Sequence, residues 1–535
     1  MLTRKVLTAV LGFLALTVPV RAGNDPFLKE RQGRLSHELN MRALGAAGTR
    51  VPGMRGSSLR GGQNLVTAVI ELERSADAGA VRAQVAAAGG RVLVGIDHLL
   101  KVQLPATALR GVSETAGVAR VRSPFKPARK EVVSEGAITT HAREYGARTG
   151  ATGAGVTVAV LDGGFASARD LLDSELPGDT TATDFVLERI GSYEDQHGTA
   201  CAEIVHDMAP GAKILLAGFE DDVTWAQAVD ELAGAGVRIV SHSIGFDNLL
   251  PPDGNNYYTQ KVDAAAAAGV LFVTAAGNEG QKYYQGTWRD TNGNGFLEFG
   301  GGRMELLPIG APAGGSQVVL RWDDGFGVSN HDYDLLIVTE GFASNPVLSA
   351  DNPTILASAA DLQNGAGLPR EIASFEMEED QVLYAVVVHD PASPLNSAQR
   401  FWIWASGGVD GSVAVPSGTL SLPGDARGAL TVGAVNFGSG GVEPFSSRGP
   451  TQDGRVKPDI AGPDGVSTAA YGGEPFFGTS AATPHVAGAA ALILSRNPGL
   501  SAQALRSALE QATAGQGRSR NNDVGAGVLD LNLVR

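Results

Sequence analysis

The pattern of apolar and polar residues changes its period along the chain, and these changes divide it into segments. Over residues 64–124, short alternating runs and helical runs predict the order strand, helix, strand, strand, helix, strand, beginning with the strand Leu65–Glu73. From Val156 onward, apolar runs rich in β-branched residues alternate with helical patterns, the last of them at Ala502–Thr513. This alternation predicts an α/β fold, in which a parallel sheet carries helices on both faces and the active site lies at the carboxyl ends of the strands.

One long stretch interrupts the alternation with strand-like segments separated by turn residues, a pattern that favours a β-sandwich. We therefore expect residues 283–424 to form an inserted β-sandwich-like domain within an α/β domain of residues 151–282 and 425–535. An exosite, a lid, a stabilising element and a passive surface insertion all remain open as its role. The strand-like segments are Gln317–Trp322, Tyr333–Val338, Val382–Val388 and Phe401–Trp404.

The first residues have the pattern of an export signal. Arg4 and Lys5 precede an apolar run from Val6 to Val20, and Val20-Arg21-Ala22 is a plausible cleavage pattern, so residues 1–22 are expected to be a signal peptide. Residues 23–63 are rich in Gly, Arg and Ser and are expected to be a disordered lead-in. Because no other stretch approaches transmembrane length, we expect a secreted protein, extracellular or periplasmic, with no membrane anchor.

Composition narrows the choice of cross-links and partners. The chain has 535 residues and one cysteine, so an intramolecular disulfide is impossible. Residues 1–131 carry 20 Lys and Arg against 9 Asp and Glu, whereas the remainder carries 22 against 48. The basic front and the acidic body would attract each other; a basic leader with no docking role is the alternative. No basic patch is interleaved with aromatic residues, so a nucleic-acid partner is not expected.

Three short blocks carry candidate chemistry. Ser480 lies where a buried helix begins, so free backbone N–H groups and the positive end of the helix dipole are available to a developing oxyanion. Asp162 ends an apolar, β-branched run, and His197 opens another expected helix. A serine nucleophile needs a base to remove its proton and usually a carboxylate to orient that base. The three residues could supply this set.

The blocks VAVLDGGF, HGTACAEI and GTSAATPHVAG, together with Ala-Ala-Gly-Asn278, resemble the signature blocks of the subtilisin-like serine proteases, in the same order along the chain. The resemblance covers roughly half of the chain. It implies that Asp162 orients the base, His197 is the general base and then acid, and Ser480 is the nucleophile. It also implies that Asn278 and the N–H of Ser480 form the oxyanion hole for protein or peptide substrates.

The family resemblance also implies how a peptide would be held. Ser243 and Gly245 would pair with the substrate backbone as an added strand, and three further residues would edge the pocket for the residue before the cleaved bond. A buried structural strand is the alternative at both places. The pocket residues are Ala275, Ala276 and Gly277.

The strand and helix order of residues 64–124 resembles the ferredoxin-like inhibitory propeptide of the same family, which would make the chain's own propeptide an intramolecular inhibitor. Residues 125–150 would then be a connector that contains the maturation cleavage. A permanent accessory domain is the alternative to a propeptide.

Several features leave room for other interpretations. Asp162, His197, Asn278 and Ser480 could each be structural on its own, although four such blocks in order favour catalysis. The family often has His and Gly where Ala200 and Glu203 stand, and Met where Ala481 stands, which concerns specificity more than activity. A catalytically silent binding protein on the same scaffold is the alternative function.

The remaining chemistry is a possible calcium loop and a cysteine. Oxygen side chains at alternate positions from Asp290, with a glycine at the sixth position, match the first half of an EF-hand loop, but Gly301 stands at the twelfth. A structural calcium site completed by other residues and a solvated turn are both open. Cys201 lies one helical turn beyond His197, so mercury reagents are expected to inhibit. The candidate ligands are Asp290, Asn292, Asn294 and Glu298.

Overall fold

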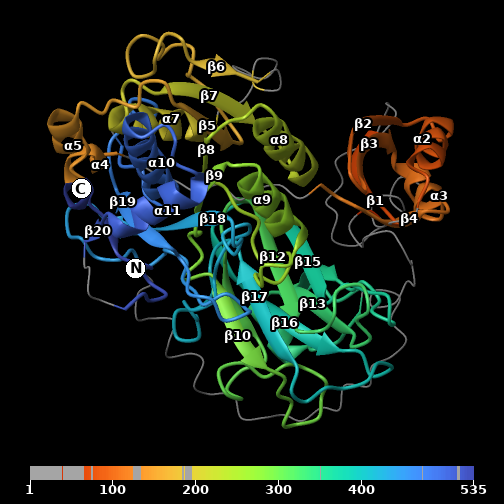
Figure 1. Ribbon diagram of the computed structural model, residues 1–535. Coiled ribbons are helices and arrows are strands. Elements are labelled where there is room, and N and C mark those ends of the chain that lie inside the picture. The colour runs from red at the N-terminus through yellow and green to blue at the C-terminus, as the bar shows by residue number, and fades with distance from the viewer. Residues whose placement is uncertain are drawn as a thin grey trace.

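The computed structural model describes residues 39, 65–73, 76–124, 134–183, 186, 195–349, 351–472, 474–514 and 519–534. The expected signal peptide, nearly all of the expected lead-in and residues 125–133 of the expected connector lie outside the described residues. Figure 1 shows the described part as three groups of strands, each with its own packing.

The largest group is a parallel sheet, as the alternation of strands and helices predicts. Among the described residues, nine strands lie in the order β20-β21-β19-β18-β9-β8-β5-β7-β6, and only the pair β20–β21 is antiparallel. The strands are β5 (Thr157–Asp162), β6 (Thr181–Ala182), β7 (Lys213–Gly218), β8 (Ile239–His242), β9 (Leu271–Ala275), β18 (Ala429–Asn436), β19 (Ile460–Asp464), β20 (Thr513–Ala514) and β21 (Val528–Leu529).

Helices cover both faces of this sheet (Figure 1), which explains why its strands are continuously apolar. Along β5, Val158 and Val160 join the core on one face, while Ala159 and Leu161 join the core on the other. The first core includes α7 (His197–Met208), α10 (Thr479–Arg496) and α11 (Ala502–Gln511), beside the short α4 (Gly136–Thr139) and α5 (Ala142–Thr149). The second includes α8 (Asp222–Gly234) and α9 (Tyr257–Ala267).

The N-terminal unit, residues 65–122, has the element order expected from its sequence. Its antiparallel sheet has the order β2-β3-β1-β4 and packs with its helices around a separate apolar core. The elements are β1 (Leu65–Leu72), α2 (Ala78–Ala87), β2 (Arg91–Ile96), β3 (Leu99–Pro105), η2 (Ala106–Ala108), α3 (Leu109–Ser113) and β4 (Val118–Arg122).

The N-terminal unit contacts α8 and α9 through apolar and charged side chains. Val69 and Leu99 pack against Val223 of α8. Beside them the Lys101 ammonium lies 2.6 Å from the Asp221 carboxylate, and Arg122 pairs with Asp222. All four charged side chains are buried, so the opposite charges of the front and the body meet in an interface that excludes water.

The two-sheet unit, residues 283–405, consists of two antiparallel sheets with the orders β10-β17-β12-β15 and β11-β16-β13-β14. Side chains of both sheets share one core, which includes Trp322, Tyr333 and Phe401. The elements are β10 (Tyr283–Thr287), β11 (Leu307–Ala311), β12 (Gly314–Trp322), β13 (Tyr333–Val338), η3 (Glu340–Ser344), β14 (Ile355–Ala359), β15 (Arg370–Met377), β16 (Gln381–His389) and β17 (Arg400–Ala405).

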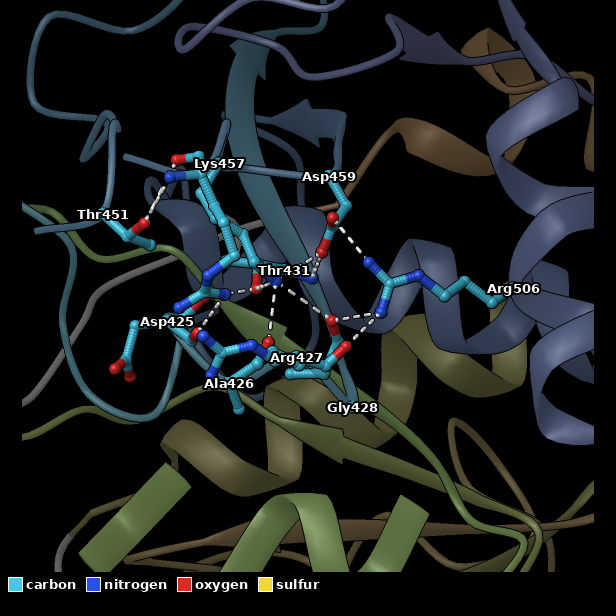
Figure 2. A network of polar contacts seen from close by, with 12 residues as sticks. Asp425, Ala426, Arg427, Gly428, Thr431, Thr451, Lys457, Asp459 and Arg506 are labelled. Atoms are coloured by element: carbon cyan, nitrogen blue, oxygen red, sulfur yellow. Dashed lines mark hydrogen bonds and ion pairs between the residues drawn. The ribbon is translucent and has the colours of Figure 1, made fainter. Parts of the chain in front are cut away.

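A buried network of charges ties α11 to the loops around β18 and β19, and Figure 2 shows it from close by. The Lys457 ammonium lies within hydrogen-bond distance of four oxygens, which its three N–H groups share: the Ala426 carbonyl at 3.0 Å, the Ala429 carbonyl at 3.1 Å, Thr431 Oγ1 at 2.8 Å and Asp459 Oδ2 at 2.7 Å. On its other oxygen, Asp459 accepts from Arg506 at 2.6 Å and Arg520 at 3.0 Å.

The last described element is the short η4 (Leu531–Leu533). None of the helices in the described ranges is long and apolar enough to span a membrane.

Candidate active site

Asp162 and His197 meet at the carboxyl end of the sheet. Asp162 is the last residue of β5 and His197 the first of α7, and both are buried. The imidazole Nδ1 lies 2.8 Å from Asp162 Oδ2 and 2.9 Å from Oδ1. A carboxylate at this distance accepts a hydrogen bond from Nδ1–H, which leaves Nε2 as the basic nitrogen. The pair therefore has the geometry of an oriented general base.

Ser480 is the second residue of α10, and the glycine before the helix sets its approach. Gly478 has a φ of 134°, which a side chain would strain, and α10 begins at Thr479, one residue earlier than its sequence pattern indicates. The Ser480 hydroxyl donates to the Ser243 carbonyl at 2.8 Å. Ser243 thus holds the hydroxyl of the expected nucleophile in place.

A proline inside α10 explains a second contact between the same two residues. Pro484 has no N–H, so the Ser480 carbonyl four residues earlier cannot receive the usual helical hydrogen bond. That carbonyl instead accepts from the Ser243 hydroxyl at 3.0 Å and from the Cys201 thiol at 3.8 Å. Helix α10 is therefore tied to the chain beyond β8 at the turn that carries Ser480.

Asn278 lies just beyond β9, and its amide is oriented by the residue before Ser480. Its Oδ1 accepts from both the N–H and the hydroxyl of Thr479, each at 2.9 Å. Since both bonds use the oxygen, the NH2 end of the amide is directed away from Thr479. This leaves Nδ2 as a donor for an oxyanion.

The residues expected to hold substrate lie at the ends of neighbouring strands β8 and β9, and all are buried. The Ala276 N–H donates to the Val432 carbonyl at 2.9 Å, and its carbonyl accepts from Ser421 N–H at 2.9 Å. Gly277 N–H donates to Thr479 Oγ1 at 3.2 Å. These groups are used within the protein, so Ala276 and Gly277 can only edge a pocket. Ala275 is the last residue of β9, and Ser243 and Gly245 follow the neighbouring strand β8.

Cys201 lies next to the pair of Asp162 and His197. Its Sγ and the nearest ligand atoms of those two residues lie within 4.8 Å of one another, and the thiol is fully buried. Burial, together with the charge of Asp162, raises the pKa of the thiol well above its ordinary value. Cys201 is therefore a neutral thiol that lies beside the candidate catalytic residues.

The sequence pattern did not identify Asp464 as a site residue. Its place as the last residue of β19, like that of Asp162 in β5, is the signal that could have done so. Its Oδ2 accepts from the N–H of Gly478 at 2.9 Å, two residues before Ser480. Burial raises the pKa of Asp464 to about 7, and the nearby carboxylate of Glu443 adds to the shift. The turn before the nucleophile is thus held by a carboxyl group that titrates near neutral pH.

In the candidate calcium loop, Asp290 lies at the centre of the turn as the sequence indicates. The carboxylate beside Asn292 and Asn294, however, is not that of Glu298. Asp290 accepts from the N–H groups of Gly293, Asn294 and Gly295. Glu298 instead accepts from Thr291 and pairs with Arg289 at 3.0 Å. Glu305, which the sequence analysis did not identify, accepts from Asn292 at 2.6 Å and Asn294 at 2.9 Å. The carboxylate and amide oxygens are the type of ligand that calcium prefers.

Comparisons with known proteins agree with this architecture. Residues 153–317 and 379–527 match the model of the Subtilase family, and the chain belongs to that family of serine peptidases. Its resemblance to subtilisin-like proteases is thereby confirmed.

Two curated relatives match shorter stretches. Serine protease AprX of Bacillus subtilis is 32% identical over 189 residues, which are 30% of this chain and 42% of AprX. Subtilisin amylosacchariticus of Bacillus subtilis subsp. amylosacchariticus is 38% identical over 115 residues, which are 22% of this chain and 29% of that protein. The matched stretches thus span less than half of either relative.

Among solved structures, the Clostridium perfringens CspB protease has a TM-score of 0.51 and 17% identity, and the match covers 75% of this chain and 98% of that one. At this identity the similarity supports the fold alone.

Proposed function

We propose that this protein is a secreted subtilisin-like serine endopeptidase that cleaves peptide bonds through an acyl-enzyme intermediate. The observation that carries the proposal is the buried hydrogen bond of 2.8 Å between His197 Nδ1 and Asp162 Oδ2, at the same sheet edge as Ser480. Family membership supports it. A silent binding protein would have no need for an oriented histidine beside a helix-terminal serine.

Each residue has a defined step in the proposed reaction. The Ser480 hydroxyl turns from the Ser243 carbonyl and attacks the peptide carbonyl, while His197 Nε2 takes its proton. Asn278 Nδ2 and the Ser480 N–H hold the oxyanion. His197 then donates the proton to the leaving amine, and water, activated by the same histidine, hydrolyses the acyl-enzyme.

We further propose that the N-terminal unit is an inhibitory propeptide, removed by self-processing within residues 125–150. Support comes from its interface with α8 and α9, where Lys101 and Arg122 meet Asp221 and Asp222. The apolar contact of Val69 and Leu99 with Val223 would keep the unit bound after a cut in the connector, and the buried ion pairs would fix its orientation.

The test follows the intact mass of the chain beside Ser480→Ala, with Ser439→Ala, an exposed serine in a turn, as the matched control. We expect the native chain and the control to lose about the first 125 to 150 residues and to label with a fluorophosphonate probe. Ser480→Ala should do neither. A folded native chain that stays whole, never labels and cleaves no casein would favour the binding protein.

We propose calcium as a structural ion for the loop of Asp290, Asn292 and Asn294, with Glu305 in place of Glu298 as the completing carboxylate. Bound there, the ion would cross-link the entry of the two-sheet unit and take no part in catalysis. Calorimetry on chelator-treated protein tests this, with Glu305→Gln beside Glu298→Gln. Equal calcium binding by both variants, or no binding between micromolar and millimolar calcium, would exclude the assignment.

We propose that the two-sheet unit stabilises the position of Asn278, the residue assigned to the oxyanion hole. Trp404 Nε1 donates to Glu279 Oε2 at 2.7 Å, and Glu279 follows Asn278 directly. Trp404→Phe should lower kcat with little change in KM, because the oxyanion forms only in the transition state. Trp402→Phe, on the same strand, is the control, and equal effects of both changes would mean general destabilisation.

A further inference from the structure

Glu203 stands where the family often has glycine, and the proposed catalytic steps give it no role. The residue lies on α7, six positions after His197, and its side chain is almost fully buried. A buried carboxylate is destabilising unless it is hydrogen-bonded, so its partners indicate what it does.

Those partners are two consecutive backbone groups of one loop. Glu203 Oε2 accepts from the N–H of Ala469 at 2.7 Å, and Oε1 accepts from the N–H of Ala470 at 3.0 Å. The loop leaves β19 and returns to α10, and an isolated bridge between Val466 and Phe476 closes it. One carboxylate from the helix of the histidine thus holds the middle of the loop.

The same loop packs aromatic rings against the histidine. The ring of Tyr471 lies 4.6 Å from that of Phe476, and the ring of Phe476 lies 5.6 Å from the imidazole of His197, centroid to centroid. Phe476 is almost completely buried. The position of the imidazole therefore depends on where this loop lies.

We propose that Glu203 is a positioning residue for His197: it clamps the loop 466–476 so that Phe476 and Tyr471 hold the imidazole in line with Ser480. The kinetic part of this inference rests on the proposed peptidase function, whereas the clamp itself does not. Glu203 touches neither substrate nor reacting atoms in this role.

The clamp requires an ionised carboxylate. A protonated carboxyl group presents one O–H, which donates and so opposes one of the two N–H groups. Burial raises the pKa of Glu203 to about 7, and the charges of Glu175 and Asp207 add to the shift. The clamp is therefore complete above this pH and loses one bond as the pH falls through it.

The experiment compares native protein with Glu203→Gln, whose amide offers one acceptor and one competing donor. Asp207→Asn is the matched control. Asp207 lies on the same helix, and its pKa is raised to about 6, chiefly by burial and by the charge of Glu175, but it makes no hydrogen bond to the described residues of the loop. Hydrogen exchange of the loop peptide, in a Ser480→Ala background that prevents self-digestion, and kcat/KM of a peptide substrate against pH are the two measurements.

We expect loop amides in Glu203→Gln to exchange at least tenfold faster at pH 9, roughly the effect of one lost hydrogen bond to a charged group. We also expect kcat/KM to fall about tenfold there, and its acid limb to become less steep because one titrating group is gone. Asp207→Asn should retain the exchange rate and the steepness of the limb, although the limb should move to lower pH because the charge of Asp207 no longer raises the pKa of Glu203.

Each contrary result has its own meaning. Unchanged exchange in Glu203→Gln would overturn the clamp. Faster exchange with a native pH profile would overturn the positioning of His197. Native protein that neither hydrolyses peptide nor labels with a fluorophosphonate would refute the proposed function and the positioning role, while the exchange result would still decide the clamp.

Discussion

Replacing Lys457 by alanine should create a binding site for a small cation in the place that its ammonium group occupies. The ammonium lies 2.7 to 3.1 Å from four oxygens in the network of Figure 2, and one of them belongs to the Asp459 carboxylate. Lys457→Ala removes the charge and leaves an oxygen-lined space. A sodium or ammonium ion from solution could enter that space, whereas Lys457→Met would fill it with an apolar chain.

The loss of folding stability in Lys457→Ala depends on the hydrogen bonds that Asp459 keeps. Removing one partner of a buried ion pair usually costs about 3–5 kcal/mol. Because Asp459 still accepts from Arg506 and Arg520, we expect the lower end, about 3 kcal/mol. For a domain of this size that corresponds to a fall in Tm of roughly 6–12 °C.

The assay is denaturant and thermal unfolding in the Ser480→Ala background, with sodium, ammonium or tetramethylammonium chloride at equal ionic strength. Lys457→Ala should regain stability in the first two salts only, and Lys457→Met in none. The exposed Lys213→Ala is the control. A loss below about 1 kcal/mol, or equal stability in all three salts, would refute the reasoning about the oxygen cage.

Three further predictions concern the active site. Asn278→Ala should lower kcat by about a hundred- to a thousand-fold with the fold intact, measured by peptide hydrolysis and circular dichroism; near-native turnover would remove Asn278 from the oxyanion hole. Mercury(II) should inhibit by binding Cys201, whereas iodoacetamide should react poorly because burial raises the pKa of the thiol. Full activity after Cys201 has been shown by mass to carry mercury would contradict this. For Asp464, burial raises the pKa of the carboxyl from 3.8 to about 7, so its stabilising protonated form is present below pH 4 and is lost as pH rises through 7. Asp464→Asn should therefore raise Tm more at pH 8.5 than at pH 5, and a uniform change would argue against that titration.

The sequence alone indicated the α/β class and the candidate catalytic residues, because both depend on local patterns. The apolar run that ends at Asp162 and the helix that begins at His197 are decided by residues a few positions away. The same holds for the element order of the N-terminal unit. In the two-sheet unit the local pattern was less informative. Strand β15 was missed because it begins with buried Arg370 and Glu371, which resemble surface residues until their partners are known.

Only the tertiary structure decided how the site is held, since its contacts join residues that lie far apart in the chain. Ser243 and Ser480 are separated by 237 positions, and Glu203 and Ala469 by 266. Hydrogen bonds such as these form only after packing brings two backbones together, and a single sequence carries no local signal for them. For the same physical reason, the orientation of the Asn278 amide and the cage around Lys457 could be seen only in the folded chain.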